Sequence, residues 1–392
     1  MIPGWSRLSA LGALALAMLV VPSCTAGAGP ATGCRGGWQV LTGPADARES
    51  SELFGVSVVS RREVWAVGVT RPSGGRARTL VERWRAGEWH PLPSPDRPAA
   101  DSFLNAVAAR SASDAWAVGL SRSAGGAART LILHWDGRRW AITASPNTGP
   151  GDNFLESVAV VSARDAWAVG YRDAGGVFRS LVEHWDGGRW TVAALPRLGA
   201  LGNGLNAVNV AASGIVWAVG GSAGARGHTQ PLVLRLDGRR WYSVAAPASL
   251  HSATLNGVAA SGGRGAWVVG AVRGSGGDRS FGLQADRRHW RVVPVDPAGA
   301  LSEDLNAIWA AAPDDMWAAG SSFDGRWYRP LVEHSVGGRW LRAATPALPG
   351  YDGALMAVDG FADGQLWAVG SAARSAGPER ALMLHRCASA PS

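Results

Sequence analysis

The sequence of 392 residues contains no lysine, only three cysteines and only four tyrosines. All 38 of its basic residues are therefore arginines, a usage that fits a GC-rich genome. No Ser-His-Asp arrangement, zinc-ligand spacing or phosphate-cradling glycine loop can be recognised in it. The sequence therefore has no motif that names a reaction, and we expect neither a metal nor a cofactor.

What the sequence does contain is a repeat of about 50 residues. The phrase Trp-Ala-Val-Gly, or a close variant, starts at intervals of 50 or 51 residues at Trp65, Trp116, Trp167, Trp217, Trp267, Trp317 and Trp367. A second tryptophan recurs at intervals of 49 to 51 residues at Trp38, Trp89, Trp140, Trp190, Trp241, Trp290 and Trp340. Such a period is the signature of one supersecondary unit repeated around an axis or along a solenoid.

One copy of the repeat, residues 104–146, shows what the unit forms. Short apolar runs, separated by turn-prone residues, begin at Leu104, Ala115, Thr130 and Trp140. Asp136-Gly137 predicts a tight hairpin between the last two runs, because both positions tolerate positive φ. None of the runs has the period or length of a helix, and so the unit is predicted to be four short β-strands, A to D in chain order.

The second strand of the unit indicates how neighbouring units pack. Trp116 and Val118 point to one face of the sheet, whereas the small residues Ala115, Ala117 and Gly119 point to the other. A bulky face can therefore fit the small face of the next sheet, as in the wedge-shaped interior of a propeller. Seven such units predict an all-β, seven-bladed β-propeller with a tryptophan core. An open β-solenoid, which would need distinct capping repeats, is the alternative.

The two ends of the repeat region predict how the ring closes. After Trp367 the chain supplies only one more strand, and the missing fourth strand stands near the other end as Trp38-Gln39-Val40-Leu41. We therefore expect the N-terminal strand to complete the last blade. Alignment with the other hairpins places Cys34 and Cys387 at the missing turn, where a disulfide would add on the order of 3–5 kcal/mol of stability. Two unpaired buried thiols are the alternative.

The first 23 residues have the features of an export signal. Arg7 gives a weak positive start, and the apolar run from Leu11 to Val21 is too short to span a bilayer. Val21-Pro22-Ser23-Cys24 resembles the lipobox of bacterial lipoproteins, which implies lipidation of Cys24. The chain would then divide into a signal peptide at 1–23, a lipidated tether at 24–33, the propeller at 34–388 and a tail at 389–392. Ordinary secretion is the alternative, and either location is oxidising enough for the disulfide.

The formal net charge of +8 bears on the choice of partner. A strongly basic chain suggests nucleic acid, but an exported protein would not meet it. We therefore expect a monomer on the outer face of the cell membrane, or secreted, whose basic surface meets anionic lipids or envelope polymers.

Two stretches of the repeat carry a resemblance to known proteins. Asp-Ala-Trp-Ala-Val-Gly followed by His-Trp-Asp-Gly-x-x-Trp occurs within 114–140 and 165–190. The combination resembles a repeat of exported actinobacterial proteins that are described as galactose-oxidase-like or kelch-like propellers of unknown role. The sequence lacks the Gly-Gly doublet and tyrosine of kelch, the Gly-His signature of WD40 and the Asp-boxes of sialidases. A galactose-oxidase copper site is not expected either, since two cysteines are assigned to structure.

Most polar candidates recur at equivalent positions and are interpreted as structural. They are the strand-C residues His134, His184, His334 and His385, the pre-strand-B residues Asp114, Asp165 and Asp315, and the strand-A residues Asn105, Asn206, Asn256 and Asn306. We expect the aspartates to bond the turn backbone and the asparagines to satisfy backbone groups near the axis. The B–C loops end in a ring of arginines at Arg78, Arg129, Arg179, Arg279, Arg329 and Arg380, with Gln230 the exception. We expect this ring to pair with Asp101, Asp152, Asp304 and Asp352, and a basic collar for phosphate or carboxylate groups is the alternative.

Blade six departs from the symmetry and supplies the candidate site. Its B–C loop is rich in aromatic residues where other blades have Gly, Ser and Ala, and Tyr351-Asp352 follows in the next inter-blade loop. The predicted ligand-binding residues are Phe323, Arg326, Trp327, Tyr328, Tyr351 and Asp352. We expect a non-enzymatic binding or scaffold module for an envelope glycan, peptide or protein, although these residues would also suit a local hydrophobic plug.

The opposing hypothesis is a propeller enzyme, a hydrolase or lyase, with a site at the mouth of the channel. Its first candidates are His228, His251, Asp304 and Asp352. An enzyme needs several such side chains to converge on one pocket, whereas a binding module needs a shaped and partly apolar surface.

Overall fold

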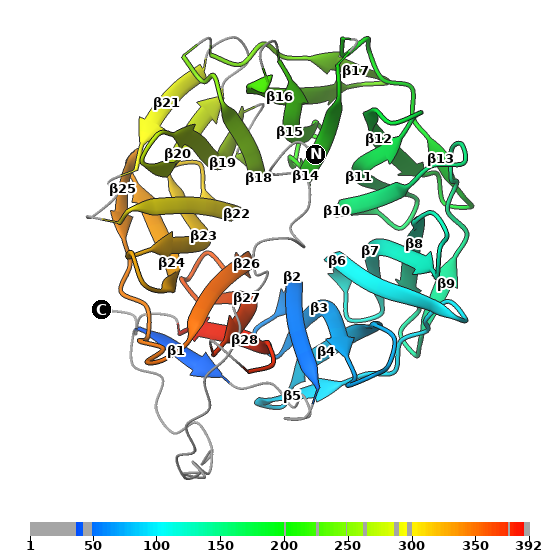
Figure 1. Ribbon diagram of the computed structural model, residues 1–392, viewed down its shortest axis with the longest axis horizontal. Helices are drawn as coiled ribbons and strands as arrows, with labels where there is room; N and C mark the ends of the chain where they lie inside the picture. Colours follow the sequence, from blue (N-terminus) through cyan, green and yellow to red (C-terminus); the bar gives the residue numbers. More distant parts are fainter. Residues whose placement is uncertain are drawn as a thin grey trace.

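The computed structural model describes residues 37–41, 49–199, 201–224, 227–247, 249–261, 265–285, 290–295, 300–374 and 377–387. Within these ranges the chain forms 28 β-strands and no α-helix. The strands form seven antiparallel sheets of four, arranged as a ring around a central axis (Figure 1). The predicted seven-bladed β-propeller is therefore confirmed, and the open solenoid is wrong. No helix in the described ranges is long and apolar enough to cross a membrane.

Each blade has strand A nearest the axis and strand D at the rim. Blade 1 contains β2 (Ser50–Ser60), β3 (Glu63–Arg71), β4 (Arg78–Arg85) and β5 (Glu88–Pro91). Blade 2 contains β6 (Ala100–Ser111), β7 (Asp114–Ser123), β8 (Arg129–Trp135) and β9 (Trp140–Thr143). Blade 3 contains β10 (Asn153–Ser162), β11 (Asp165–Asp173), β12 (Phe178–Trp185) and β13 (Trp190–Val192).

The second half of the ring repeats the pattern. Blade 4 contains β14 (Asn203–Val210), β15 (Val216–Ala223), β16 (Thr229–Asp237) and β17 (Arg240–Ser243). Blade 5 contains β18 (Ala253–Ser261), β19 (Gly265–Gly274), β20 (Gly277–Ala285) and β21 (Trp290–Pro294). Blade 6 contains β22 (Ser302–Ala312), β23 (Asp315–Phe323), β24 (Tyr328–Val336) and β25 (Arg339–Arg342). Blade 7 contains β26 (Asp352–Gly360), β27 (Leu366–Ala373), β28 (Arg380–Arg386) and, from the other end of the chain, β1 (Trp38–Leu41).

The ring closes through the N-terminal strand, as the sequence predicted. β1 pairs with β28 in antiparallel register, with Trp38 opposite Arg386. Blade 7 is joined to blade 1 by a hydrogen bond from the Val58 N–H to the carboxylate of Asp359, 2.7 Å long. Burial raises the pKa of Asp359 to about 6, and the backbone N–H groups that it accepts oppose this shift.

The cysteines are only partly within the described residues. Cys387 follows β28 and is buried, with its Sγ 3.8 Å from His385 Nδ1. Cys24 and Cys34 lie outside the described residues, as do the signal segment 1–23, the tether 24–33 and the tail 389–392. The Cys34–Cys387 disulfide and the lipidation of Cys24 therefore stay predictions.

The two tryptophans of each repeat pack together across the blade junctions. Trp65 of blade 1 is fully buried against Leu104, Ala115 and Ala117 of blade 2. The strand-D residue Trp140 of blade 2 meets the Trp65 ring edge-on, at 5.3 Å between centroids. The pairs Trp116–Trp190, Trp267–Trp340 and Trp367–Trp89 repeat this T-shaped contact. Bulky-on-small packing thus forms the core, and such aromatic pairs add stability beyond their buried area.

Strand B carries a glycine three residues after its tryptophan. Only glycine fits there, because the backbone of strand A lies against this position. A Cβ on Gly68 would lie 1.9 Å from the carbonyl oxygen of Glu52, and one on Gly320 would lie 1.9 Å from that of Asp304. A side chain would therefore displace the innermost strand, on which the lining of the central channel depends.

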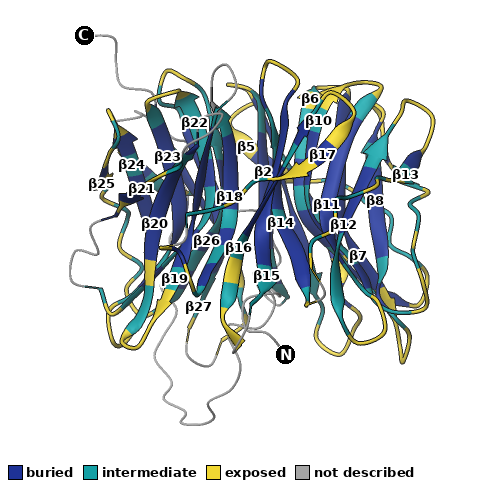
Figure 2. Cartoon of the chain, turned by 90° about the horizontal axis from the view of Figure 1, so that it is seen from above, coloured by how far each residue is buried: buried dark blue, intermediate teal, exposed yellow. Residues whose placement is uncertain are grey.

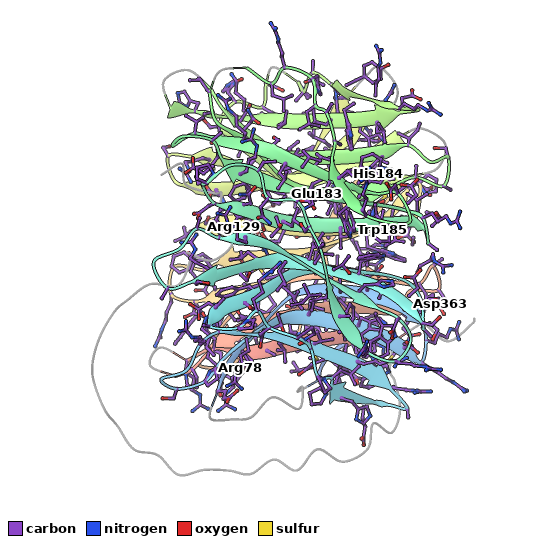
Figure 3. All side chains as sticks on the ribbon, turned by 90° about the vertical axis from the view of Figure 1, so that its right-hand side faces the viewer. Arg78, Arg129, Glu183, His184, Trp185 and Asp363 are labelled. Atoms are coloured by element: carbon purple, nitrogen blue, oxygen red, sulfur yellow. The ribbon has the colours of Figure 1, made fainter. Side chains whose placement is uncertain are left out.

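The connections of the ring lie on two opposite faces. The loop face carries the B–C loops and the D–A loops that join consecutive blades, and the turn face carries the A–B turns and the C–D hairpins. Figure 3 shows Arg78 and Arg129 toward the loop face and Asp363, in an A–B turn, toward the turn face. Buried residues fill the middle of the blades, and exposed residues gather at the two faces (Figure 2).

Candidate functional site

The aromatic residues predicted in blade 6 lie together on the loop face. Phe323 ends β23 and Tyr328 begins β24, so that they form a cross-strand pair with ring centroids 5.0 Å apart. Asp324 shapes the loop between them, because its Oδ1 accepts the N–H groups of Arg326 and Trp327 at 2.9 and 2.8 Å. The N–H groups of Trp327 and Arg326 hold the pKa of Asp324 below its usual value. The loop is therefore anchored through its backbone and presents its side chains outward.

Cations flank two of the half-buried aromatic rings. The guanidinium groups of Arg326 and Arg329 lie 5.4 and 5.8 Å from the centroid of Trp327. Arg374, from the B–C loop of blade 7, lies 4.7 Å from the centroid of Tyr351. Together Phe323, Trp327, Tyr328 and Tyr351 form what we call the aromatic platform. Tyr328 is 40% exposed, whereas Phe323, Trp327 and Tyr351 are half-buried, and ligand binding by the platform stays a prediction.

Asp352 has a structural role, and its predicted ligand binding stays a prediction. Its Oδ1 accepts the Tyr328 N–H at 2.7 Å, which joins blade 7 to the platform loop. Asp101 and Asp152 accept the N–H groups of Ala77 and Ala128 in the same way at the equivalent junctions. The aspartate is therefore part of the repeat, and the aromatic side chains are what set this junction apart.

A second feature of the loop face was not predicted from the sequence. A cavity of about 130 Å³ lies where blades 4, 5 and 6 meet. The side chains of this polar pocket include His228, Ser252, Thr254, Asn256, Arg273, Asp278 and Asp304. Its walls thus offer hydrogen-bond donors, acceptors and charges of both signs.

Three hydrogen bonds organise the polar pocket. His228 Nδ1 lies 2.8 Å from Ser252 Oγ, and Ser252 has a φ of 62°, which is uncommon for a residue other than glycine. Asn256 donates to Asp304 Oδ1 at 2.8 Å and to the carbonyl oxygen of Leu305 at 3.0 Å. The pocket is therefore held by contacts between adjacent blades.

The polar pocket and the aromatic platform meet at the start of β22. Ser302 pairs with Phe323 of the platform, and its Oγ accepts the N–H of Asp278, which lines the pocket, at 3.0 Å. Leu301, which is 51% exposed, donates its N–H to the carbonyl oxygen of Phe323 at 2.9 Å. A partner extended along this part of the loop face can therefore contact both regions.

The four residues suggested for an enzyme are only partly brought together. His228 and Asp304 line the polar pocket, but His251 and Asp352 do not. Among the described residues, no group of three or more His, Cys, Asp and Glu side chains is placed to hold a metal ion. The pocket thus contains a histidine and two carboxylates, without the full set that the sequence suggested.

Four arginines of the ring, Arg129, Arg179, Arg279 and Arg329, bind backbone carbonyls, and the expected Arg–Asp pairing is wrong there. Arg129 donates to the carbonyl of Gly149 at 3.1 Å, Arg179 to that of Leu201 at 2.8 Å and Arg279 to that of Ala300 at 2.7 Å. The guanidinium groups therefore fix the D–A loops. Asp152 pairs with Arg122 at 2.8 Å instead, and Asp101 and Asp352 accept backbone N–H groups of the preceding blade.

The repeated aspartates before strand B bond histidines, so the predicted bond to the turn backbone is wrong. Asp114, Asp165 and Asp315 lie 2.9, 3.0 and 2.8 Å from Nε2 of His134, His184 and His334. Each imidazole stacks on the strand-B tryptophan opposite it, with centroids 3.8 to 4.2 Å apart. The pairing of strands B and C places each histidine opposite its tryptophan. These contacts agree with the structural role that the sequence predicted for the histidines.

The asparagines of strand A satisfy the backbone, as expected, but in the next blade. Asn105, Asn206 and Asn306 each donate from Nδ2 to a leucine carbonyl of the following strand A at 2.9 Å. Strands A surround a central channel with a cavity of about 290 Å³. The asparagines therefore join neighbouring blades around the channel.

Buried glutamates on strand C are a further feature that the sequence analysis missed. Glu183, placed in the middle of its blade in Figure 3, is fully buried, and its Oε2 accepts the Ser145 hydroxyl at 2.9 Å. Burial raises the pKa of Glu183 to about 8, and the bond from Ser145 opposes this shift. Burial also raises the pKa of Glu82 to about 7. In the sequence, the sign of these buried groups is a glutamate that stands among the apolar residues of strand C.

Comparisons with known proteins show the fold and leave the function open. No protein-family model matches the sequence, and no curated protein does. A structure of YCF48 bound to D1 peptide is similar, with 15% identity, a TM-score of 0.58, and coverage of 91% of this chain and 98% of that one. An ulvan lyase of polysaccharide lyase family PL25 is also similar, with 8% identity, a TM-score of 0.57, and coverage of 88% and 95%.

A protein of unknown function from Dyadobacter fermentans has 10% identity, a TM-score of 0.52, and coverage of 90% and 98%. At these identities the likeness concerns the fold alone. Since a peptide-bound protein and a lyase are both among the similar structures, the propeller itself does not decide between binding and catalysis. The resemblance to kelch-like and galactose-oxidase-like proteins stays a prediction.

Proposed function

We propose that the chain is a membrane-anchored, extracytoplasmic binding module whose loop face holds a peptide or protein partner across blades 4 to 7. The observation that carries this proposal is the meeting of the polar pocket and the aromatic platform at Ser302. An extended peptide alternates polar backbone groups with side chains, and this surface offers a polar cavity beside partly exposed aromatic rings. Aromatic and arginine side chains are also the residues that most often anchor protein partners.

The proposed location follows from the sequence. The apolar segment and lipobox-like motif that precede the ring lie outside the described residues, and they imply export and lipidation of Cys24. An envelope peptide or protein would then be the accessible partner. The similarity to a peptide-bound propeller supports this choice at the level of the fold only.

Site-specific photo-crosslinking in intact cells tests the proposal. A photoreactive phenylalanine analogue at Tyr328 should give a discrete crosslinked product, and peptide mass spectrometry should identify a polypeptide in it. The same analogue at Tyr242, which is 48% exposed in the outer strand of blade 4, is the matched control and should give none. A product that contains only sugar would replace the peptide with an envelope glycan, and equal products at both positions would contradict the site.

An enzyme that uses the polar pocket is the second candidate function. The observation that favours it is the 2.8 Å contact between His228 and Ser252 in the pocket that Asp278 and Asp304 also line. Wild-type protein and His228→Ala should be incubated with envelope polysaccharides and peptides, and the products should be analysed by mass spectrometry. Turnover by the wild type that is lost in the variant would favour the enzyme, whereas binding without turnover would favour the binding module.

A further inference from the structure

The turn face carries a set of exposed arginines at the tips of the C–D hairpins. Arg139, Arg189, Arg240 and Arg339 each stand directly before the strand-D tryptophan of blades 2, 3, 4 and 6. Arg138 and Arg239 add a second cation to two of these tips, and all six are exposed. We call these six residues the hairpin arginines. Because the repeat fixes their position, they are spread over one face of the ring.

The residues that the structure describes leave the charge of these arginines largely without a neutralising partner. Among the described residues, the one ion pair that involves them is a contact of 3.9 Å between Arg189 and Asp186, with the Arg189 side chain 80% exposed. The hairpin carboxylates are directed into their own turns. Asp136 accepts the N–H groups of Arg138 and Arg139 at 2.8 and 2.9 Å, and Asp186 repeats this arrangement. Short carboxylates thus bond the turn backbone while the longer guanidinium groups reach solvent.

The N-terminal strand enters the ring on this same face. Trp38 is opposite Arg386, and Arg386 is opposite Leu366, the first residue after the A–B turn of blade 7. The segment that precedes β1 therefore joins the propeller at the turn face. Cys24 and Gly37 stand 13 positions apart in the sequence. A fully extended segment of that length spans at most about 45 Å, and it would link a lipid on Cys24 to the propeller at the turn face.

We propose that the turn face lies against the anionic surface of the membrane, with the hairpin arginines bound to lipid phosphate groups. The planar guanidinium group matches the geometry of a phosphate. An anionic bilayer also attracts nearby basic residues, each of which raises the affinity about fivefold. The loop face, with the polar pocket and the aromatic platform, then points away from the membrane. This orientation rests on the proposed membrane anchoring. The attraction between the hairpin arginines and anionic lipids does not depend on the anchor.

Binding to lipid vesicles tests the inference with two matched charge variants. The first is Arg139→Gln/Arg240→Gln/Arg339→Gln on the turn face, and the second is Arg76→Gln/Arg78→Gln/Arg380→Gln on the loop face. All six arginines are exposed, and each variant lowers the net charge by three. Both are made in the full chain with Cys24→Ala, so that no lipid anchor contributes. Residues 1–23 are present in every protein, and any binding by them is therefore shared.

Co-sedimentation is measured with phosphatidylcholine vesicles that contain 30% phosphatidylglycerol or none. We expect the unsubstituted chain to prefer the anionic vesicles, the turn-face variant to lose at least tenfold in affinity, and the loop-face variant to stay within about twofold. Equal losses in both variants, or no preference for anionic vesicles, would overturn the inference. Binding to a soluble anionic polymer but not to vesicles would overturn it too. Lipidation is absent from this assay, so a failure here is distinct from a failure of the proposed anchoring.

Discussion

The carboxylate of Asp352 accepts the backbone N–H of Tyr328 at 2.7 Å and so ties the inner strand of blade 7 to the aromatic platform of blade 6. The same bond joins Asp101 to Ala77 and Asp152 to Ala128 at junctions that have no exposed tyrosine. The hydrogen bond that supports the candidate site is therefore common to several blades. What distinguishes the junction of blades 6 and 7 is the aromatic side chains that this bond positions.

Replacing Asp352 with alanine should separate these two contributions. The variants Asp352→Ala and Asp101→Ala each remove one charge-assisted bond, so both should lose about 1–2 kcal/mol of stability, measured by chemical unfolding. Only Asp352→Ala should also weaken crosslinking from the platform, because it releases the Tyr328 backbone. Equal crosslinking by the two variants would show that the platform does not depend on this bond.

Glu183 should make the protein less stable as the pH rises. Its pKa is about 8 in the folded chain and near the usual 4.5 when unfolded. The stabilising contribution is therefore complete below about pH 4.5, and it is lost as the pH rises through 8, at about 1.4 kcal/mol per pH unit. Glu183→Gln should flatten this part of the stability profile, measured by urea unfolding from pH 5 to 9. The exposed Glu88→Gln is the control, and a profile equally steep in Glu183→Gln and the wild type would refute the assignment.

The predicted Cys34–Cys387 disulfide should join the two ends of the propeller. Cys387 is buried beside the strand that completes blade 7, which is where a bridge would replace a hairpin turn. Peptide mapping without reductant should recover a linked pair of peptides that contain these two cysteines. Recovery of both thiols alkylated in the native protein would rule the bridge out.

Lipidation of Cys24 should hold the protein in the membrane fraction. We expect Cys24→Ala to move it to the soluble fraction in cells grown and lysed at physiological salt, because the acyl chains supply the stable anchor. The matched variant Ser23→Ala keeps a small residue before the cysteine and should stay with the membrane. Unchanged fractionation of Cys24→Ala would exclude the lipid anchor.

The repeat made most of the fold predictable from the sequence. The spacing of Trp65 and Trp116 gave the size of a blade, and the strand-like run at Trp38 gave the closure of the ring. The platform was also visible, because Trp327 and Tyr328 break a pattern of small residues. Local deviations of this kind can be recognised in a repeat since every other copy serves as a reference.

The polar pocket could not be found in the same way, because it forms from strand and loop residues of three different blades. Its one signal was weak: position 304 holds an aspartate where Phe103 and Phe154 stand in other blades. The bonds of Asp114 to His134 and of Arg129 to the Gly149 carbonyl were misassigned for a related reason. Which of two nearby groups a side chain bonds depends on strand register and loop path, and the spacing of the repeat does not contain that information.

The central claim, that the loop face holds a peptide or protein partner across the polar pocket and the aromatic platform, is tested most directly by partner capture with substituted proteins. The intact chain, the Trp327→Ala/Tyr328→Ala variant and the control Tyr242→Ala are each immobilised and exposed to solubilised envelope proteins and glycans. Bound material is then quantified by mass spectrometry. We predict that the wild type and Tyr242→Ala retain the same polypeptide and that the double variant retains at least tenfold less of it. Equal capture by the double variant and the wild type would contradict the account.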